Sequence, residues 1–416
     1  MKKVIRMSCI VVFLSSIISC EKNECENYTL ATPVTLTLDE FRNSVKITVP
    51  QVIQKSGKIY AYGNYIFVND KKKGIHVIEN SNPTSPRKIA FINIPGNEDI
   101  SIKDNYLYAD SLIDLVIFDI SDLESIVQVG RLEDVFPNNI AWTRDVDFYD
   151  WSNYNPNDII IDWNITIERK LEDEILPYET LGGVWNVNVL SNNALSADAQ
   201  VGQGGSLARF KIVEDYLYSV DRHSIHIFDI QNLETPVKSG SVYAGFDIET
   251  VFNKDQFLFL GSMSGMFIYD ISQADSPQYV SEFRHGTACD PVVVDGDYAY
   301  ITLRGGNSCG AFESSLQIVN ISDIYNPKLE VSYSLSNPYG LGINNEKLFI
   351  CDGSSGFKVF DKTNNNDLVL LNHFENINAF DVIPLENNLL LIGENTLYQY
   401  KYTKNNIELL SSFSLN

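Results

Sequence analysis

Four aspartates stand at the start of short apolar runs in this 416-residue chain, and carboxylates can do several kinds of chemistry. They are Asp99 in NEDISI, Asp247 in GFDIETV, Asp290 in ACDPVVV and Asp381 in AFDVI. If the fold brings them together, their oxygens could hold Ca²⁺ or another hard cation. A pair at a defined separation could instead serve as the acids of a glycosidase. The structural alternative is that each accepts hydrogen bonds from backbone N–H groups.

Signatures of other chemistries are missing from the sequence. There is no P-loop, no G-x-G-x-x-G that opens a helix, no H-E-x-x-H and no G-x-S-x-G. The five histidines are scattered, and His223 and His226, three residues apart, form at best a weak metal pair. The formal net charge of −23 disfavours binding to nucleic acid, because an acidic surface repels phosphate.

The elements that must position the aspartates can be read from a recurring stretch, SIHIFDIQNLETP at residues 224–236. Its interleaved β-branched and aromatic residues predict a strand, and its Asn and Pro predict a turn into a second strand. Related stretches begin at residues 74, 114, 265, 315, 356 and 396. Together with the one at 224, the seven starts lie 40, 110, 41, 50, 41 and 40 residues apart. A period near forty residues fits four short strands, which is one blade of a β-propeller.

These copies resemble the LVIVD repeat, whose core reads roughly L-V-I-V-D-I-S-(D/N)-P-x-x-P. DLVIFDISDLESI at 114–126 and GMFIYDISQADSP at 265–277 match it best, and the copy at 396 matches poorly. The resemblance covers about residue 58 to the C-terminus. It implies a β-propeller of the bacterial cell surface, in a family mostly without an assigned activity.

We therefore predict an all-β fold, a β-propeller of seven four-stranded blades. The alternative is eight blades, with a degenerate one in an insertion at about 137–205. The domain prediction is a signal peptide at 1–19, a lipidated tether at 20–33 and the propeller at 34–416. Residues 45–49 look able to pair with a neighbouring blade, which would close the ring.

The N-terminus predicts export. Lys2, Lys3 and Arg6 precede an apolar run at 10–18 that is too short to span a bilayer, and Ile17-Ile18-Ser19-Cys20 resembles a lipobox. Cys20 would then carry lipid and anchor the protein to the cell envelope, in the outer membrane or at the surface of a Gram-negative bacterium. The alternative is an ordinary secretory signal in which this cysteine is a coincidence.

The strand order also predicts one loop-rich face. In a meander of strands a to d, the b–c loops and the connections to the next blade emerge together, so the four aspartates should ring one mouth of the central channel. Cys289 and Cys309 lie in two such loops, and an exported protein permits the disulfide that we expect between them. A catalytic cysteine beside His285 is the alternative.

The insertion belongs to the same face and contains all four tryptophans of the chain, which are candidates for stacking on a ligand. They are Trp142, Trp151, Trp163 and Trp185. Long loops in compact domains are often functional, whereas the alternatives are a degenerate blade or an elaborated hairpin.

These observations favour a surface-anchored, non-enzymatic propeller that binds an envelope protein or a glycan through its loop-rich face. One alternative is a propeller hydrolase that acts on a polysaccharide, with acids drawn from Asp99, Asp247, Asp290 or the insertion. The other is a purely structural component of the envelope.

Overall fold

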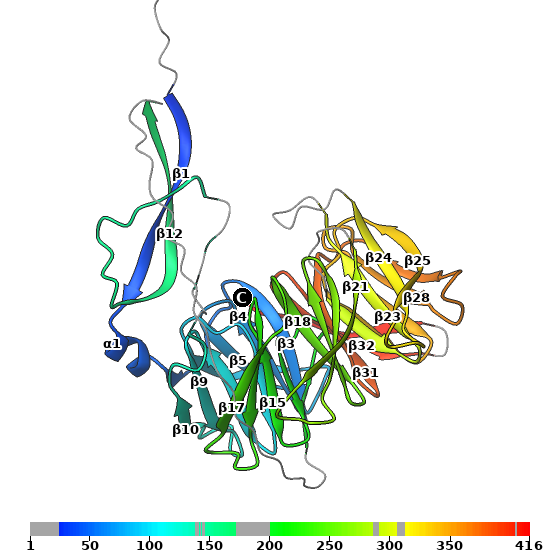
Figure 1. Cartoon of the computed structure of the whole chain (residues 1–416), viewed down its shortest axis with the longest axis horizontal. Helices are drawn as coiled ribbons and strands as arrows, with labels where there is room; N and C mark the ends of the chain where they lie inside the picture. Colours follow the sequence, from blue (N-terminus) through cyan, green and yellow to red (C-terminus); the bar gives the residue numbers. More distant parts are fainter. Residues whose placement is uncertain are drawn as a thin grey trace, which may run out of the picture.

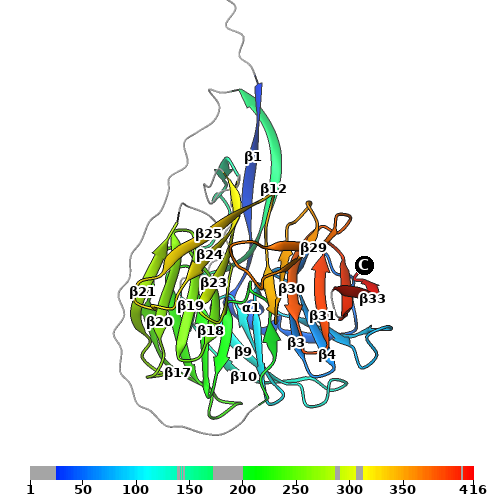
Figure 2. The ribbon, with the colours of Figure 1, turned by 90° about the vertical axis from the view of Figure 1, so that its right-hand side faces the viewer.

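The computed structural model of the chain describes residues 25–137, 141, 143, 146–171, 200–285, 291–305, 313–403 and 406–416. Seven antiparallel meanders of four strands stand around a central axis (Figures 1 and 2). The innermost strands contact one another in sequence order, and the seventh contacts the first. The predicted all-β propeller with seven blades is confirmed.

Each blade takes its four strands from one continuous segment. Blade 1 consists of β3 (Ser56–Tyr62), β4 (Tyr65–Asp70), β5 (Gly74–Glu79) and β6 (Arg87–Asn93). Blade 2 consists of β7 (Ile100–Lys103), β8 (Tyr106–Ser111), β9 (Asp114–Asp119) and β10 (Val127–Leu132). Blade 3 consists of β14 (Phe210–Val213), β15 (Tyr216–Val220), β16 (Ser224–Asp229) and β17 (Val237–Tyr243).

The second half of the ring follows the same plan. Blade 4 consists of β18 (Ile248–Lys254), β19 (Phe257–Ser262), β20 (Gly265–Asp270) and β21 (Gln278–Arg284). Blade 5 consists of β22 (Val292–Asp295), β23 (Tyr298–Leu303), β24 (Ser314–Asn320) and β25 (Lys328–Leu335). Blade 6 consists of β26 (Leu341–Asn344), β27 (Lys347–Cys351), β28 (Phe357–Asp361) and β29 (Val369–Phe374), and blade 7 of β30 (Ala379–Pro384), β31 (Asn388–Gly393), β32 (Thr396–Tyr402) and β33 (Ile407–Ser414).

The recurring stretch forms strand c and the turn after it. Strands b and c are almost wholly buried because a neighbouring blade covers each of their faces, whereas the outer strand d alternates between exposed and half-buried residues. The aspartate that ends strand c accepts an N–H two residues on, as Asp119 does from Ser121 at 2.8 Å. All seven c–d pairs also contain a register shift at the same place, where one extra residue bends strand d.

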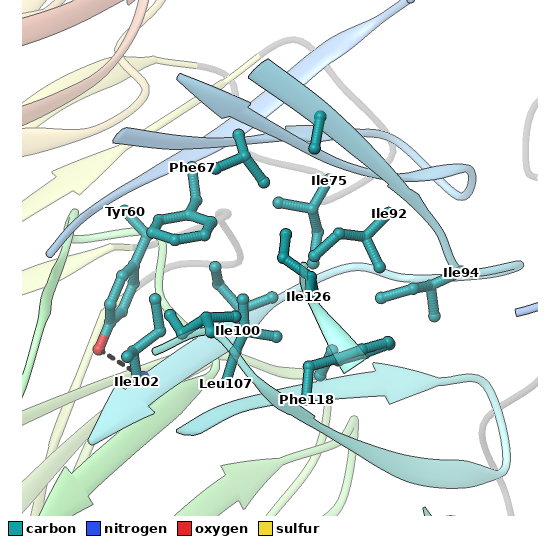
Figure 3. Close-up of a cluster of buried hydrophobic side chains, with 14 of the residues drawn as sticks. Tyr60, Phe67, Ile75, Ile92, Ile94, Ile100, Ile102, Leu107, Phe118 and Ile126 are labelled. Carbon is teal, nitrogen blue, oxygen red and sulfur yellow. Dashed lines mark hydrogen bonds between the residues drawn. The ribbon is translucent and has the colours of Figure 1, made fainter. Parts of the chain in front are cut away.

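Hydrophobic side chains between adjacent blades form the core. Figure 3 shows the cluster between blades 1 and 2, where Phe67 and Ile75 face Ile102 and Phe118. The hydroxyl of Tyr60 lies at its edge and accepts the N–H of Ile102 at 3.0 Å. Burying such surfaces stabilises the fold by about 25 cal/mol per Å² of apolar area, so the ring depends on every interface between blades.

The ring closes by side-chain and backbone contacts between blades 7 and 1, and no strand is exchanged between them. Asn80 and Gln399 donate to one another, at 3.1 and 2.7 Å, and the N–H of Ile53 donates to the carbonyl of Leu415 at 3.1 Å. Residues 46–48, within the segment expected to close the ring, form β2 (Lys46–Thr48) and pair with the outer strand β6 of blade 1. Their expected role in closure is therefore not found.

The eighth sheet is a three-stranded wing that extends away from the ring (Figures 1 and 2). It joins β1 (Cys25–Leu36) to β12 (Ile159–Leu171) along their length and to the short β11 (Phe148–Tyr149). Because its central strand comes from the N-terminal segment, this part of the insertion is not a four-stranded eighth blade. Residues 25–33, expected to lie in a polar tether, are part of β1.

The base of the wing is fixed to blade 2. The short helix α1 (Leu38–Asn43) follows β1 and is capped by Thr37 and Glu40 in a capping box. Its Phe41 is buried beside Leu112, and its Arg42 donates to Asp114 at 3.0 Å. Among the described residues, no helix is long and apolar enough to cross a membrane.

Candidate functional site

Two of the four predicted aspartates join neighbouring blades. The Asp99 carboxylate accepts the N–H groups of Arg209 and, at 3.1 Å, Phe210, which begin blade 3. The Asp381 carboxylate accepts the N–H of Ile59 in blade 1 at 3.3 Å and that of Val382 at 3.0 Å. Both carboxylates are buried, and burial raises the pKa of Asp381 to about 7 although the two N–H donors oppose the shift. Asp99 and Asp381 therefore have the structural role that was the alternative for them, which is to accept hydrogen bonds from backbone N–H groups.

The remaining two aspartates do not complete a ring of acids. Asp247 accepts from the guanidinium of Arg222, at 2.8 Å from its Nε, and Asp290 lies outside the described residues. In the part of the chain that the structure describes, no three His, Cys, Asp or Glu side chains gather as a metal site. The described members of the set make the protein contacts given above, and the binding of Ca²⁺ stays a prediction.

A glycine-rich segment, VGQGGSLAR at 201–209, runs through the central channel, and with Gln200 we call it the plug. It enters beside the a–b turn of blade 2, where Gln200 exchanges hydrogen bonds with Asp104. Its strand β13 (Gln203–Gly204) pairs with β3 of blade 1. Ser206 then accepts the N–H of Leu341 in blade 6 at 2.8 Å, and Ala208 accepts that of Val251 in blade 4 at 2.8 Å.

At two positions the plug needs glycine, because the inner strands leave no room there for a side chain. A Cβ at Gly202 would lie 2.3 Å from the ring of Tyr60, and one at Gly205 would lie 2.2 Å from Oδ1 of Asp381. The plug therefore fills the channel, so that its mouth is a blind-ended hollow. The sequence signal, GQGG, was visible, but repeat spacing could not tell a channel plug from a loop.

The mouth of the channel is a pocket of about 380 Å³ on the face from which the wing rises. Its residues come from blades 1, 2, 3, 4, 6 and 7, and Leu207 and Arg209 of the plug belong to its lining. Lys72 lines an adjoining hollow and pairs with Asp162 of the wing at 3.7 Å, which places the base of the wing beside this mouth.

Cations gather at the mouth of this acidic protein. Three of them have carboxylate partners: Arg209 donates to Glu98 at 2.5 Å, Lys58 lies 3.3 Å from Asp99, and Arg222 holds Asp247. Burial alone would raise the pKa of Glu98, but Arg209 and Lys58 outweigh it and lower that pKa. The mouth is thus not the ring of negative charge that the sequence predicted.

Two further cations make no ion pair with any described residue. Lys71 extends from the b–c turn of blade 1 and is exposed, and its pKa is lowered by partial desolvation in the mouth and by the charges of Lys55, Lys58 and Arg304. Arg304 lies at the end of strand b of blade 5, with its guanidinium 4.2 Å from the ring centroid of Tyr339. Its Nε is buried and has no hydrogen-bond partner.

Within the described part of the chain, the aromatic rings at this face come from the blades and not from tryptophans. Tyr339 and Phe380 line the mouth edge to face, with centroids 5.0 Å apart. Phe246 precedes the mouth residue Asp247 and is 65% exposed. Trp163 is buried in the wing and Trp151 packs against it, which makes both of them core residues there, while Trp142 and Trp185 lie outside the described residues.

The predicted lipidation and disulfide sites fall outside the described residues, since Cys20, Cys289 and Cys309 are all among the undescribed positions. Cys351 is a buried free thiol in β27, and burial raises its pKa well above the usual value.

A second recurring aspartate, at the end of strand b, was missed by sequence reasoning. Asp70, Asp110 and Asp352 each accept two backbone N–H groups from the segment that enters strand a of their own blade. In blade 3, Asp221 accepts from His223 and Ser224 and pairs with His226 at 2.9 Å. The repeated aspartate was visible in YIFVND, YLYAD, YLYSVD and KLFICD.

Comparison with known proteins agrees with this architecture. The LVIVD repeat family matches residues 55–90, 97–134 and 285–334, which cover blades 1, 2 and 5. None of the curated proteins compared with the chain matches it.

Two solved structures share the fold at low identity. The periplasmic gluconolactonase PpgL of Pseudomonas aeruginosa is 10% identical, with a TM-score of 0.52 over 86% of this chain and 96% of that one. The computationally designed protein Ika8 is also 10% identical, with a TM-score of 0.51 over 88% of this chain and 89% of that one. Identity this low shows the fold alone, and the chain is a β-propeller that contains LVIVD repeats.

Proposed function

We propose that this protein is an exported, lipid-anchored binding protein that takes its ligand at the mouth of the plugged channel. The observation that carries the proposal is the pocket of about 380 Å³, which six blades and the plug line together. Pockets for small ligands have volumes of roughly 300–1,000 Å³ and combine aromatic walls with a few polar groups. Tyr339 and Phe380 provide such walls, and the cations provide such groups.

The state of the carboxylates supports binding over hydrolysis of a polysaccharide. A glycosidase needs two carboxyl groups that face the sugar from an open site. Asp99 and Asp381 are buried and accept backbone N–H groups, while Asp247 is held by Arg222. Of the aspartates from which the hydrolase alternative would draw its acids, Asp99 and Asp247 are therefore occupied by structural contacts, and Asp290 lies outside the described residues.

The mouth can be tested by photo-crosslinking in cells of the source bacterium. A photoreactive p-benzoyl-phenylalanine replaces Tyr339 at the mouth in one variant and Tyr325 in another. Tyr325 is 75% exposed in the c–d turn of blade 5, on the opposite face, and is therefore a matched control. We expect crosslinked products from position 339 and none from position 325. Products from 325 alone, or none from 339, would refute the proposal.

A further inference from the structure

The charges at the mouth are unevenly paired. On the side of blades 2 to 4, Arg209 and Arg222 are matched by Glu98 and Asp247. Lys71 of blade 1 and Arg304 of blade 5 have no carboxylate partner among the described residues. Lys71 lines the pocket, and the guanidinium of Arg304 lies 4.2 Å from the ring centroid of Tyr339, which also lines it. Lys71 is exposed and Arg304 is half-buried, so their unmatched positive charges would attract a ligand with an anionic group to this part of the mouth.

Aromatic surface lies beside the unpaired cations. The guanidinium of Arg304 covers the ring of Tyr339, which contacts Phe380 at an interplanar angle of 81°. Both rings are partly exposed and line the pocket. Aromatic rings present an apolar face with which the C–H face of a sugar packs well.

The paired side of the mouth suits hydroxyl groups. The ion pairs of Arg209 with Glu98 and Arg222 with Asp247 offer N–H donors and carboxylate acceptors side by side, and Glu249 lies next to them. A sugar hydroxyl can both donate and accept, so it matches such a surface. A ligand with many negative charges, such as a polyphosphate, would be repelled by these three carboxylates.

We propose that the mouth binds an acidic sugar, whose carboxylate lies between Lys71 and Arg304 and whose ring packs on Tyr339 and Phe380. The inference rests on the proposed function and narrows its ligand to uronic or sialic acids. Lys71 gives the carboxylate a point charge, while the planar guanidinium of Arg304 gives it paired N–H donors. The hydroxyl groups then face the ion pairs on the opposite side of the mouth.

The test measures binding to the full-length protein in detergent by ligand-observed NMR. Two pairs of probes differ only at one carbon: D-galacturonate with D-galactose, and D-glucuronate with D-glucose. N-acetylneuraminate and inorganic phosphate are two further probes. We expect at least one acid to bind about tenfold more tightly than its neutral counterpart, which corresponds to about 1.4 kcal/mol. Lys71→Gln and Arg304→Gln should each weaken that acid about tenfold. Lys401→Gln, at an exposed lysine of blade 7 that pairs with Glu408, should not.

Three outcomes would overturn the inference: equal binding of acids and neutral sugars, no sugar bound at all, or phosphate bound as tightly as the best acid with the same dependence on Arg304. Each of them leaves the crosslinking at Tyr339 unaffected. Loss of that crosslinking would instead remove the proposed function itself, so the two failures can be told apart.

Discussion

At the scale of single residues, the inner carboxylates act as joints between segments that are distant in the sequence. Asp381 connects the last blade to the first, and Asp110 holds the N–H groups of Glu98 and Asp99 where blade 2 begins. Burial raises the pKa of each to about 7. A carboxyl group that keeps its proton in the folded protein but loses it when unfolded makes stability depend on pH.

We expect the free energy of unfolding to fall as the pH rises from about 4 to about 7 and to level off above. Below pH 4 these two carboxyl groups are protonated in both the folded and the unfolded protein. Between the ordinary pKa of 3.8 and the raised pKa, only the folded protein keeps the protons. Each added pH unit in that range therefore lowers the free energy of unfolding by up to about 1.4 kcal/mol per group. Urea unfolding at pH 5 and pH 8 measures the difference. Asp381→Asn should reduce it, whereas Asp323→Asn, at an exposed turn, should not. An unchanged difference in Asp381→Asn would contradict this assignment.

The cysteines permit a second test at this scale. Peptide mapping without reductant should link Cys289 to Cys309, and a disulfide that closes such a loop typically contributes about 2–4 kcal/mol. Cys351 is the internal control: because it is buried with a raised pKa, it should react with iodoacetamide only after unfolding. Recovery of both Cys289 and Cys309 as free thiols from the native protein would disprove the disulfide.

At the scale of elements, the plug ties together blades that do not adjoin one another. It pairs with blade 1, receives N–H groups from blades 4 and 6, and then becomes the first strand of blade 3. The described chain thus leaves blade 2 at one face and re-enters at the other, where Gln200 meets Asp104. Its packing against Asp381 also links the plug to the joint between blades 7 and 1.

Gly205→Ala should destabilise the protein by about 1–3 kcal/mol, because the new methyl group overlaps the buried Asp381 carboxylate. Gly204→Ala is the matched control within the plug, since its Cβ would approach no atom closer than 3.3 Å. Thermal and urea unfolding of both variants would measure the costs. An equal loss of stability in the two variants would contradict this prediction and show that the channel has room for the plug to shift.

The repeating elements and the presence of an insertion were predictable from the sequence, whereas the wing and the plug were not. Strand c and its turn recur because every blade solves the same packing problem, so copies such as 224–236 reveal the period. The wing arises from a single pairing of residues 25–36 with 159–171, and one pairing leaves no repeat to detect. The charge of the mouth was missed for a related reason. Lys71 and Arg304 lie 233 positions apart in the sequence, and only the closed ring brings both of them to the mouth.

At the scale of the whole molecule, the wing and the predicted anchor together orient the ring. The wing rises from the face that contains the mouth, and β1 begins at its far end with Cys25 (Figures 1 and 2). Twelve residues of strand extend about 40 Å, and the five residues from Cys20 to Cys25 reach at most about 18 Å. Lipid on Cys20 would therefore hold the tip of the wing near the bilayer and turn the mouth toward the membrane.

This orientation can be measured in proteoliposomes with a fluorescent amino acid and lipids that carry a quencher in the headgroup. The label replaces Ile167, which is 75% exposed near the tip of the wing, or Asp323, at the opposite face of the ring. We expect quenching at 167 and none at 323, because the wing separates the ring from the bilayer. Cys20→Ala should abolish both the quenching and membrane fractionation. Fractionation that survives this substitution would refute lipidation at Cys20, whereas lipid-dependent quenching at 323 but not at 167 would retain the anchor and reverse the orientation.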